Sequence, residues 1–460
     1  MSLISSISGT RGTIGGKVGE NLTPIDTVKF AAAFGTWLKL KTRSRKVVIG
    51  MDARPSGPMV HGLVSHTLVS LGFEVHDMGL STTPSVEMAV PEFKAAGGII
   101  LSASHNPVEW NALKLLNARG EFVTRKDGLE ILEILENEMY EFEDVRKLGK
   151  IISYEGGYVA EHIKKIQDLK LVDNFAVKRA KLKIVVDGVN SSGGIYVPQL
   201  LHAMGVKDVI KLNCEPNGWF THDPEPLKKN LTELSEVIKK EGADLGIAVD
   251  PDVDRLVFID NEGEMFGEEY TLVAIADYIL SHTKSSVVSN LSSSRALADV
   301  AARHGCRYYA SAVGEVNVTE IMKRTDAIIG GEGNGGIIYQ PLHYGRDALV
   351  GIALFLSHLV KSKKTCAELR ATYPDYFMAK EKITLEPGMD VDGILKGFHT
   401  RYKDEKVNDT DGVKVDFEES WVHLRKSNTE PIIRIYTEAK TQEEADSLAK
   451  RFIGELKTLA

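Results

Sequence analysis

Cysteine is scarce in this chain, with only three cysteines among 460 residues. They are odd in number, far apart and in no CxxC spacing, so neither a disulfide framework nor a structural zinc site is expected. No apolar run reaches the roughly 20 residues that a membrane-spanning helix needs. The longest run, residues 348–360, predicts a buried helix. Because no apolar run of signal-peptide length is present near the start either, we expect a cytoplasmic protein that does not bind membranes.

An excess of positive charge is absent as well. The 56 Lys and Arg residues are outnumbered by 64 Asp and Glu residues, which gives a formal net charge of -8. Such a chain does not attract polyanions, so nucleic acid is not an expected partner. With 43% hydrophobic and 26% charged residues, the composition is that of a globular protein and excludes a disordered or collagen-like chain.

Three similar segments follow one another along the chain. Each begins with a β-branched run typical of a buried parallel strand, followed by a helical pattern, a helix-ending glycine and a second strand. The initial runs are KVVIG at 46–50, KIVVD at 183–187 and SVVSN at 286–290. Three further apolar strands, at 98–101, 245–249 and 327–329, run into polar loops at 102–107, 250–255 and 331–336. Since ligands bind beyond the carboxyl ends of strands in open α/β sheets, we expect three domains that face one cleft.

After about residue 373 the pattern changes to strands and two helices that predict a smaller α+β domain. The expected fold is therefore three similar α/β domains with mixed, largely parallel sheets, plus a C-terminal α+β domain, around one central cleft. The expected domain limits are 1–150, 151–257, 258–373 and 374–460.

Alternating carboxylates follow the strand at 245–249. Asp250, Asp252 and Asp254 offer hard oxygens that suit Mg²⁺ or Ca²⁺. An EF-hand is excluded, because its sixth position would be Arg255 instead of Gly and its twelfth Asn261 instead of Glu. The alternative is a solvated acidic turn that caps backbone amides. Crowded carboxylates beside a buried strand repel one another, so a metal site is the favoured interpretation.

The loop SASHNP at 102–107 contains Ser104 next to His105. A locally hydrogen-bonded turn is one interpretation. A hydrolase triad is disfavoured because no GxSxG elbow is present. A serine at the same place in its repeat as a metal loop instead suggests phosphoryl transfer, in which a metal neutralises charge on the phosphoryl oxygens.

The loop GEGNGG at 331–336 matches the spacing GxGxxG. A strand-like segment follows it, whereas a dinucleotide-binding fingerprint opens a helix, so that interpretation fails. The loop either lets Glu332 and Asn334 approach a polar ligand or forms a plain tight turn.

The fourth polar loop lies in the C-terminal domain. Its guanidinium, hydroxyl and amide groups complement a phosphate dianion, although surface salt bridges are the alternative. The residues concerned are Arg425, Ser427, Asn428 and Thr429.

Together and in this order, the four loops resemble those of the α-D-phosphohexomutase superfamily, and the resemblance covers nearly the whole chain. SASHNP is similar to the phosphoserine loop, and DPDVDR is similar to the metal loop DGDxDR. GEGNGG is similar to the sugar loop GExSGH, and RKSNTEP to the phosphate loop RxSxTEP.

The resemblance implies roles for individual residues. Ser104 would carry a phosphoryl group, and Asp250, Asp252 and Asp254 would bind Mg²⁺ with an oxygen of phosphorylated Ser104 as a further ligand. Lys114 would be a general acid or base. The resemblance also implies that Arg11, His105 and Arg255 lie near the transferring phosphate, that Glu332 contacts sugar hydroxyls, and that the Arg425 loop holds the other phosphate.

The implied activity is the interconversion of hexose 6-phosphate and hexose 1-phosphate through a phosphoserine and a hexose 1,6-bisphosphate, which would also serve as activator. The implied partners are small hexose phosphates, and the chain would be a monomer or homodimer. SASHNP favours phosphoglucosamine mutase activity, whereas RKSNTEP is also similar to phosphomannomutase/phosphoglucomutases. A non-catalytic sugar-phosphate sensor and a metal-dependent phosphatase remain alternatives.

Three departures affect these expectations. Asn334 replaces the usual Ser, and Gly336 replaces the usual His, where it would leave room beside carbon 2 of the sugar. Pro251 replaces Gly and stiffens the metal loop.

Overall fold

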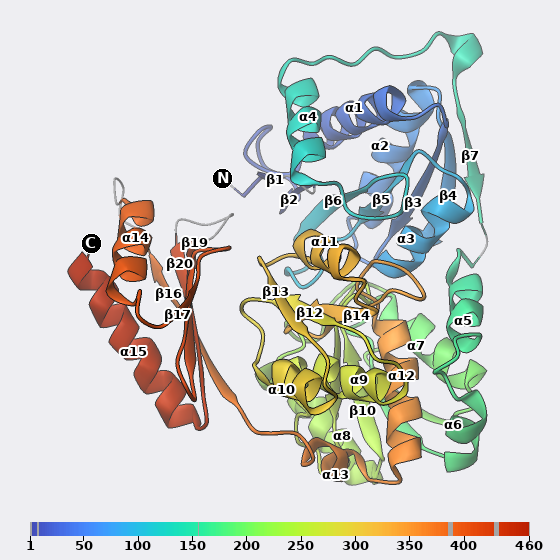
Figure 1. The fold of residues 1–460 in the computed structure, drawn as a ribbon. Helices are drawn as coiled ribbons and strands as arrows, with labels where there is room; N and C mark the ends of the chain where they lie inside the picture. The colour runs from blue at the N-terminus through green and yellow to red at the C-terminus, as the bar shows by residue number, and fades with distance from the viewer. Residues whose placement is uncertain (1, 7–8, 155, 385–389, 427–431, 460) are drawn as a thin grey trace. The chain divides into compact units, whose positions relative to one another are not determined.

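The computed structural model describes residues 2–6, 9–154, 156–384, 390–426 and 432–459. The chain forms two compact units, each described here by itself. Unit 1 comprises Met1–Thr271 and Asn334–Arg370, and unit 2 comprises Leu272–Gly333 and Ala371–Ala460. Figure 1 shows their helices and strands.

The first sheet of unit 1 has seven strands in the order β1-β2-β6-β5-β3-β4-β7. β5, β3, β4 and β7 are parallel, whereas β6, β2 and β1 are each antiparallel to their neighbours. The strands are β1 Ile4–Ser6, β2 Gly9–Thr13, β3 Lys46–Met51, β4 Glu74–Leu80, β5 Gly97–Leu101, β6 Trp110–Leu116 and β7 Lys150–Ser153. The helices are α1 Pro24–Lys41, α2 Gly57–Ser70, α3 Thr83–Glu92 and α4 Arg125–Glu136, with a 3₁₀ turn at Val145–Lys147.

Strand β3 is buried on both faces, which explains why its sequence is continuously apolar. Val47 and Ile49 belong to the core formed with α1 and α2. Val48 points the other way and packs in a second core with Val86 of α3. Helices therefore cover both faces of this sheet (Figure 1).

The second sheet of unit 1 has the order β11-β10-β8-β9, with β11 antiparallel and the other strands parallel. Its strands are β8 Lys183–Asp187, β9 Asp208–Leu212, β10 Leu245–Val249 and β11 Leu256–Ile259. The helices are α5 Val159–Gln167, α6 Asn174–Ala180, α7 Gly193–Ala203 and α8 Thr232–Glu241, with a 3₁₀ turn at Lys228–Asn230. The returning chain adds β15 Gly336–Tyr339, α12 Ala348–Ser362 and α13 Cys366–Arg370.

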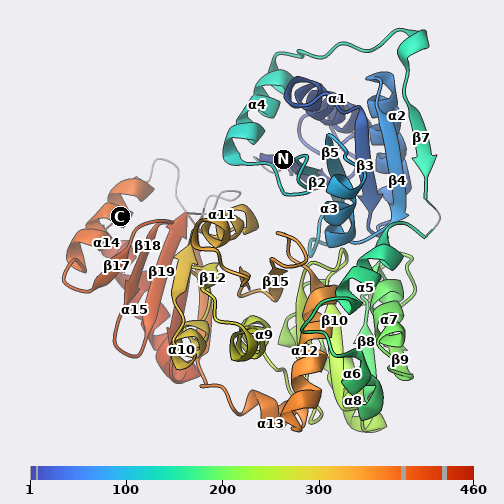
Figure 2. The same ribbon diagram turned by 45° about the vertical axis from the view of Figure 1, so that its right-hand side comes forward.

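Helix α12 packs against α5, α6 and α7, as the view in Figure 2 also shows. It is buried along most of its length, which confirms the prediction made from the apolar run at 348–360. Within the part of the chain that the structure describes, none of the helices combines the length and apolarity that a membrane span requires.

Unit 2 contains β12, which is parallel to both β13 and β14, and an antiparallel five-stranded sheet. The strand order of the five-stranded sheet is β16-β20-β19-β18-β17. The strands are β12 Val287–Asn290, β13 Tyr308–Ser311, β14 Ile329–Glu332, β16 Phe377–Thr384, β17 Lys406–Asn408, β18 Val413–Asp416, β19 Trp421–Lys426 and β20 Ile432–Ala439. The helices are α10 Ala296–Arg303, α11 Glu315–Thr325, α14 Val391–Arg401 and α15 Gln442–Leu459, while α9 Glu268–His282 extends from unit 1 into unit 2.

These sheets confirm the predicted fold class of three α/β domains and a smaller α+β domain. Gly72, Gly205 and Gly305 follow the helices as predicted and have φ of 83°, 88° and 65°, a conformation that favours glycine. A second strand follows each glycine, as the sequence indicated, and begins two or three residues after it because the turn occupies the intervening positions. The domain limits stay predictions.

Candidate active site

The predicted serine loop and acidic loop come together inside unit 1. Ser104 follows β5, and the three aspartates follow β10, each at the carboxyl end of a parallel strand. The side chains are buried: Ser104 is 8% exposed, and Asp250, Asp252 and Asp254 are 0% exposed. The serine and the acidic loop therefore form one site.

Ser104 contacts the acidic loop directly. Its Oγ donates a hydrogen bond to Asp250 Oδ2 at 2.6 Å. The other oxygen of Asp250 accepts the N–H groups of Asp254 and Arg255, both at 3.0 Å. Ser104 and Val253 have φ of 49° and 63°, which costs of order 1–3 kcal/mol for non-glycine residues. The loop geometry that joins the serine to the carboxylates is thus maintained at the expense of backbone strain.

Two cations neutralise the other carboxylates. Lys114 Nζ lies 2.5 Å from Asp252 Oδ2 and 3.3 Å from Asp254 Oδ2. Arg346 Nη2 lies 2.8 Å from the same oxygen of Asp254. The Thr83 hydroxyl donates to Asp252 Oδ2. Sequence reasoning missed Thr83 and Arg346, and no motif marks either of them.

The surroundings of Asp250 and Asp254 shift the pKa values of these two carboxyl groups in opposite directions. Burial raises the pKa of Asp250, and the charges of Asp254 and Asp252 raise it further. Burial also pushes the pKa of Asp254 upward, but Arg346 and Lys114 outweigh burial and hold that pKa below its usual value. Burial opposes the charged form of Lys114, yet Asp252 and Asp254 raise its pKa, so Lys114 is an ammonium here.

The acidic loop suits a hard divalent cation. One ligand oxygen from each aspartate lies within 4.8 Å of those of the other two. Asp252 Oδ1 and Asp254 Oδ1 are buried and have no hydrogen-bond partner within the described part of the chain. A buried carboxylate oxygen without a partner is costly, and a bound cation would remove that cost. The donor set is therefore that of a metal site.

The other predicted residues of unit 1 belong to the serine and acidic loops or contact them. His105 Nδ1 lies 3.5 Å from Ser104 Oγ, and Arg11 Nη1 lies 3.5 Å from Asn106 Oδ1. Arg255 Nη1 lies 3.3 Å from Glu225 Oε1. Burial, followed by the charges of Arg255 and Arg11, lowers the pKa of His105 to about 2, so this imidazole is neutral at pH 7.

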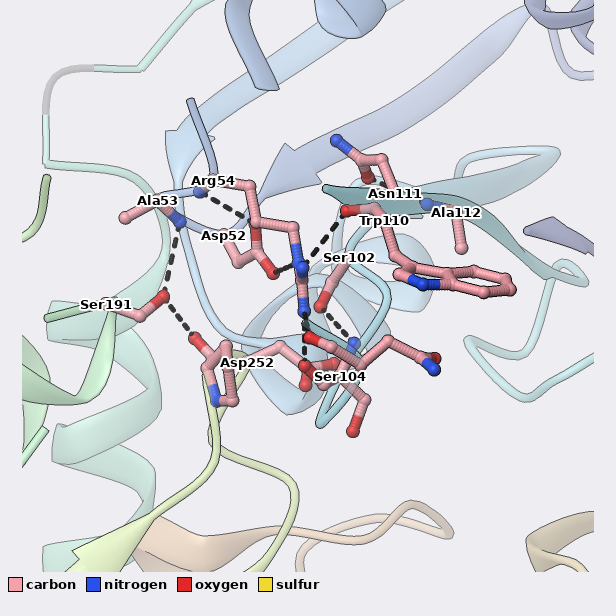
Figure 3. A network of polar contacts seen from close by, with 12 residues as sticks. Asp52, Ala53, Arg54, Ser102, Ser104, Trp110, Asn111, Ala112, Ser191 and Asp252 are labelled. Atoms are coloured by element: carbon pink, nitrogen blue, oxygen red, sulfur yellow. Dashed lines mark hydrogen bonds and ion pairs between the residues drawn. The ribbon is translucent and has the colours of Figure 1, made fainter. Parts of the chain in front are cut away.

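Arg54 holds the serine loop in place (Figure 3). Its guanidinium pairs with buried Asp52 at 3.0 Å. It also donates to four backbone carbonyls at distances from 2.5 to 3.0 Å, those of Ser104, Asn106, Pro107 and Trp110. Sequence reasoning missed Arg54. Its position directly after β3, at a strand end like those of the recognised loops, is the signal that could have found it.

Ser191 connects the first sheet's loops to the acidic loop. Its hydroxyl accepts the Ala53 N–H at 3.3 Å and donates to the Pro251 carbonyl at 2.7 Å, as Figure 3 shows. The Thr83 N–H also donates to the Asp252 carbonyl at 2.9 Å. Backbone and side-chain contacts thus align the serine loop with the carboxylates.

The expectation that Gly336 leaves room for a sugar is wrong. A Cβ atom added at Gly336 would lie 2.4 Å from Arg346 Cδ, so the Arg346 side chain already fills the space. Asn334 Oδ1 accepts the Gly336 N–H at 3.2 Å. Two of the three residues that depart from the family pattern, Asn334 and Gly336, are therefore linked to each other, and Gly336 is next to the guanidinium-bearing side chain that contacts Asp254.

Unit 2 carries the remaining predicted residues. Glu332 ends β14, and its Oε1 accepts hydrogen bonds from Asn290 Nδ2 and Gly314 N, both at 3.0 Å. Arg425 is 8% exposed, and its Nε lies 3.2 Å from Asp411 Oδ2. Ser427, Asn428 and Thr429 lie outside the described residues.

Comparison with known proteins identifies the family of this chain. Four successive family models match, described as phosphoglucomutase/phosphomannomutase alpha/beta/alpha domains I, II and III and the C-terminal domain. They match residues 5–141, 160–263, 267–376 and 379–455.

Relatives match over their full length. A phosphoglucomutase/phosphomannomutase of Thermococcus kodakarensis is 35% identical, with 94% of this chain and 95% of the relative covered. A phosphoglucosamine/phosphogalactosamine mutase of Sulfurisphaera tokodaii is 31% identical, with 99% of each chain covered. The crystal structure of a phosphoglucomutase/phosphomannomutase family protein from Burkholderia thailandensis has a TM-score of 0.84 at 22% identity, covering 99% of this chain and 98% of that one. The chain therefore belongs to the phosphoglucomutase/phosphomannomutase family, within the α-D-phosphohexomutase superfamily, and is a hexose phosphate mutase.

Proposed function

We propose that Ser104 is the phosphoryl carrier of this mutase. The observation that carries the proposal is the hydrogen bond of 2.6 Å from Ser104 Oγ to a carboxylate of the buried acidic loop. A serine hydroxyl is a poor nucleophile unless its surroundings favour the charge that develops on it. Here Arg54 fixes the backbone of Ser104, and Lys114, Arg11 and Arg255 supply positive charge nearby.

The proposed reaction passes one phosphoryl group out and another back. Phosphorylated Ser104 donates its phosphoryl group to the free hydroxyl of a hexose monophosphate, which forms a hexose 1,6-bisphosphate and leaves a serine hydroxyl. After the sugar reverses its orientation, Ser104 accepts the other phosphoryl group. Lys114, as an ammonium, donates a proton to the departing Ser104 oxygen and takes up the proton of the attacking sugar hydroxyl, so it ends the step as an ammonium again. Mg²⁺ held by Asp250, Asp252 and Asp254 would neutralise charge on the phosphoryl oxygens.

The remaining predicted residues are proposed to bind the hexose phosphate. Arg425, with Ser427, Asn428 and Thr429, would bind the phosphate that is not reacting. Glu332 would accept hydrogen bonds from sugar hydroxyls. Among hexoses we favour glucosamine for two reasons. The loop SASHNP is similar to that of phosphoglucosamine mutases. Asn334 Oδ1, which accepts one hydrogen bond from Gly336 N–H, has a second lone pair that could accept a hydrogen bond from the ammonium group of the sugar. Glucose and mannose phosphates are the alternative substrates, as in the name of the Thermococcus kodakarensis relative.

The test is a coupled assay of glucosamine, mannose and glucose 1-phosphates with a hexose 1,6-bisphosphate activator. We expect formation of 6-phosphates by the wild type and loss of that activity in Ser104→Ala. Full activity in Ser104→Ala would refute the assignment of Ser104 as the phosphoryl carrier. Net release of phosphate without isomerised sugar would support the phosphatase alternative, and binding without turnover would support the sensor.

The same assay tests the sugar. We expect glucosamine 1-phosphate to give the highest kcat/KM, although a single contact at carbon 2 provides only modest discrimination. A preference of tenfold or more for mannose or glucose 1-phosphate would reverse the choice of sugar and leave the mutase activity intact.

A substitution tests the proposed phosphate ligand. Arg425→Ala should raise KM and lower kcat, because a misplaced phosphate also misplaces the reacting hydroxyl. Arg401→Ala is the control, since Arg401 is exposed and pairs only with Glu455 in the described chain. Equal kinetics of the Arg425 and Arg401 variants would contradict the assignment.

A further inference from the structure

A second cluster of potential metal ligands lies in unit 1 outside the serine and acidic loops. His162 of α5, His343 and Asp347 meet where α12 begins. We call these three residues the histidine cluster. His162 and Asp347 are fully buried, and the His343 side chain is 13% exposed. The proposed mutase reaction uses none of them.

The inner atoms of the histidine cluster converge on one point. His162 Nε2 lies 2.8 Å and His343 Nε2 lies 3.2 Å from the same oxygen, Asp347 Oδ2. Ligands about 2.1 Å from one ion, at angles between 90° and tetrahedral, are on the order of 3 Å apart. All three ligand atoms lie within 4.8 Å of one another, which is close enough for them to share a cation.

The outer nitrogens of both imidazoles also have polar neighbours. His162 Nδ1 lies 2.9 Å from Ser85 Oγ, and His343 Nδ1 lies 3.5 Å from Glu87 Oε2. Metal-binding histidines typically direct one nitrogen at the ion while a hydroxyl or carboxylate fixes the other. Both imidazoles have this arrangement, with the inner nitrogen facing Asp347 and the outer nitrogen facing a hydroxyl or a carboxylate.

Charge also favours a cation. Glu87 and Asp347 are 1% and 0% exposed, so two carboxylates are buried beside the two imidazoles. Asp347 Oδ1 caps α12 by accepting the N–H groups of Leu349 and Val350, at 2.8 and 3.2 Å. Asp347 Oδ2 remains for the cluster, and a dication there would offset the charge of this buried carboxylate.

We propose that the histidine cluster is a second metal site, which holds a divalent cation of the Zn²⁺ type. Two imidazoles and one carboxylate suit such an ion, whereas Mg²⁺ prefers oxygen ligands only. The cation positions the start of α12. Arg346 directly precedes Asp347, so the site would also position the guanidinium that contacts Asp254. The proposal does not depend on the proposed function, because it concerns binding alone.

The experiment uses the full chain without an affinity tag, stripped of metal and kept in millimolar Mg²⁺ to occupy the acidic loop. Co²⁺ is added while the visible spectrum is recorded, and Zn²⁺ is then used to displace it. We expect one equivalent of Co²⁺ to bind with the intense absorption of a nitrogen-ligated site of low coordination number.

Variants test the ligands. His343→Gln should weaken Co²⁺ binding by about a hundredfold or more, and Ser85→Ala by about tenfold, since the latter removes only an outer partner. His61→Gln is the matched control. His61 Nε2 contacts the carboxylate of Asp77 at 2.8 Å, and the His61 side chain has a similar exposure of 15%. Circular dichroism checks that each variant is folded. Absence of Co²⁺ and Zn²⁺ binding by the folded wild type would overturn the proposal, as would equal affinity of His343→Gln and His61→Gln.

Discussion

At Gly336 a single methyl group would collide with the side chain that neutralises Asp254. The Cβ of an alanine there would lie 2.4 Å from Arg346 Cδ, while Arg346 Nη2 lies 2.8 Å from Asp254 Oδ2. Gly336 and Arg346 therefore act as a pair, because the absence of a side chain at Gly336 provides the space that the Arg346 side chain occupies. The charge at the acidic loop depends on this pairing.

Gly336→Ala should therefore displace Arg346. We expect a loss of stability of about 1–3 kcal/mol, the usual cost of overpacking, and a clear fall in kcat/KM. Gly62→Ala is the control, because Gly62 lies in α2 with no atom within 4 Å of an added Cβ. That variant should gain about 0.5–1 kcal/mol. Thermal unfolding and mutase assays of both variants measure the effects, and unchanged activity in Gly336→Ala would contradict the pairing.

The sequence predicted the polar loops and missed Arg54, Thr83 and Arg346, whose side chains reach these loops from other segments. Ser104 and the three aspartates could be found because their loops directly follow apolar strands. Thr83 and Arg346 could not, since their contacts to Asp252 and Asp254 join segments far apart in the chain. The space beside Gly336 was misjudged for the same reason.

On the scale of elements, the serine loop is held by one buried guanidinium. Arg54 covers four carbonyls between Ser104 and Trp110 and pairs with Asp52. Arginine can do this because its planar group has five donors, whereas lysine has three on a single atom. The Ser104 backbone, which has a positive φ, depends on these bonds.

Arg54→Lys should accordingly cost about 2 kcal/mol or more, because several buried carbonyls lose their donors. It should also lower kcat, since Ser104 is no longer held opposite Asp250. Arg119→Lys is the control, because Arg119 is 68% exposed and pairs with Glu121 at the surface. This substitution should change the free energy of unfolding by no more than about 0.5 kcal/mol. Denaturation curves compare the stabilities of the two variants. Equal stabilities would contradict the role of Arg54 in holding the serine loop.

The elements themselves were predictable wherever a strand is buried on both faces. KVVIG, KIVVD and SVVSN form β3, β8 and β12 almost as expected. Short antiparallel additions such as β1, β2 and β6 were not foreseen, because their pairing depends on long-range contacts and not on a local apolar run.

At the scale of the whole molecule, we expect activity to depend on a cation that offsets the charge of the buried acidic loop. Removal of Mg²⁺ by a chelator should abolish mutase activity, and added Mg²⁺ should restore it. Asp252→Asn should raise the Mg²⁺ concentration that half-restores activity. Asp260→Asn should not, because within the described ranges the Asp260 side chain accepts only the local N–H groups of Glu262 and Glu264. Activity that survives exhaustive chelation would contradict the metal assignment.

The measurement that tests the central proposal most directly is the site and fate of the phosphoryl group. The chain is incubated with hexose 1,6-bisphosphate, and intact mass and peptide mapping locate the modification. We predict one phosphoryl group on Ser104, and none on Ser102, although Ser102 is buried only two residues away. On addition of hexose monophosphate, that group should leave Ser104 and appear in newly formed bisphosphate. A stable phosphate on another residue, or full mutase activity of Ser104→Ala, would contradict the proposal.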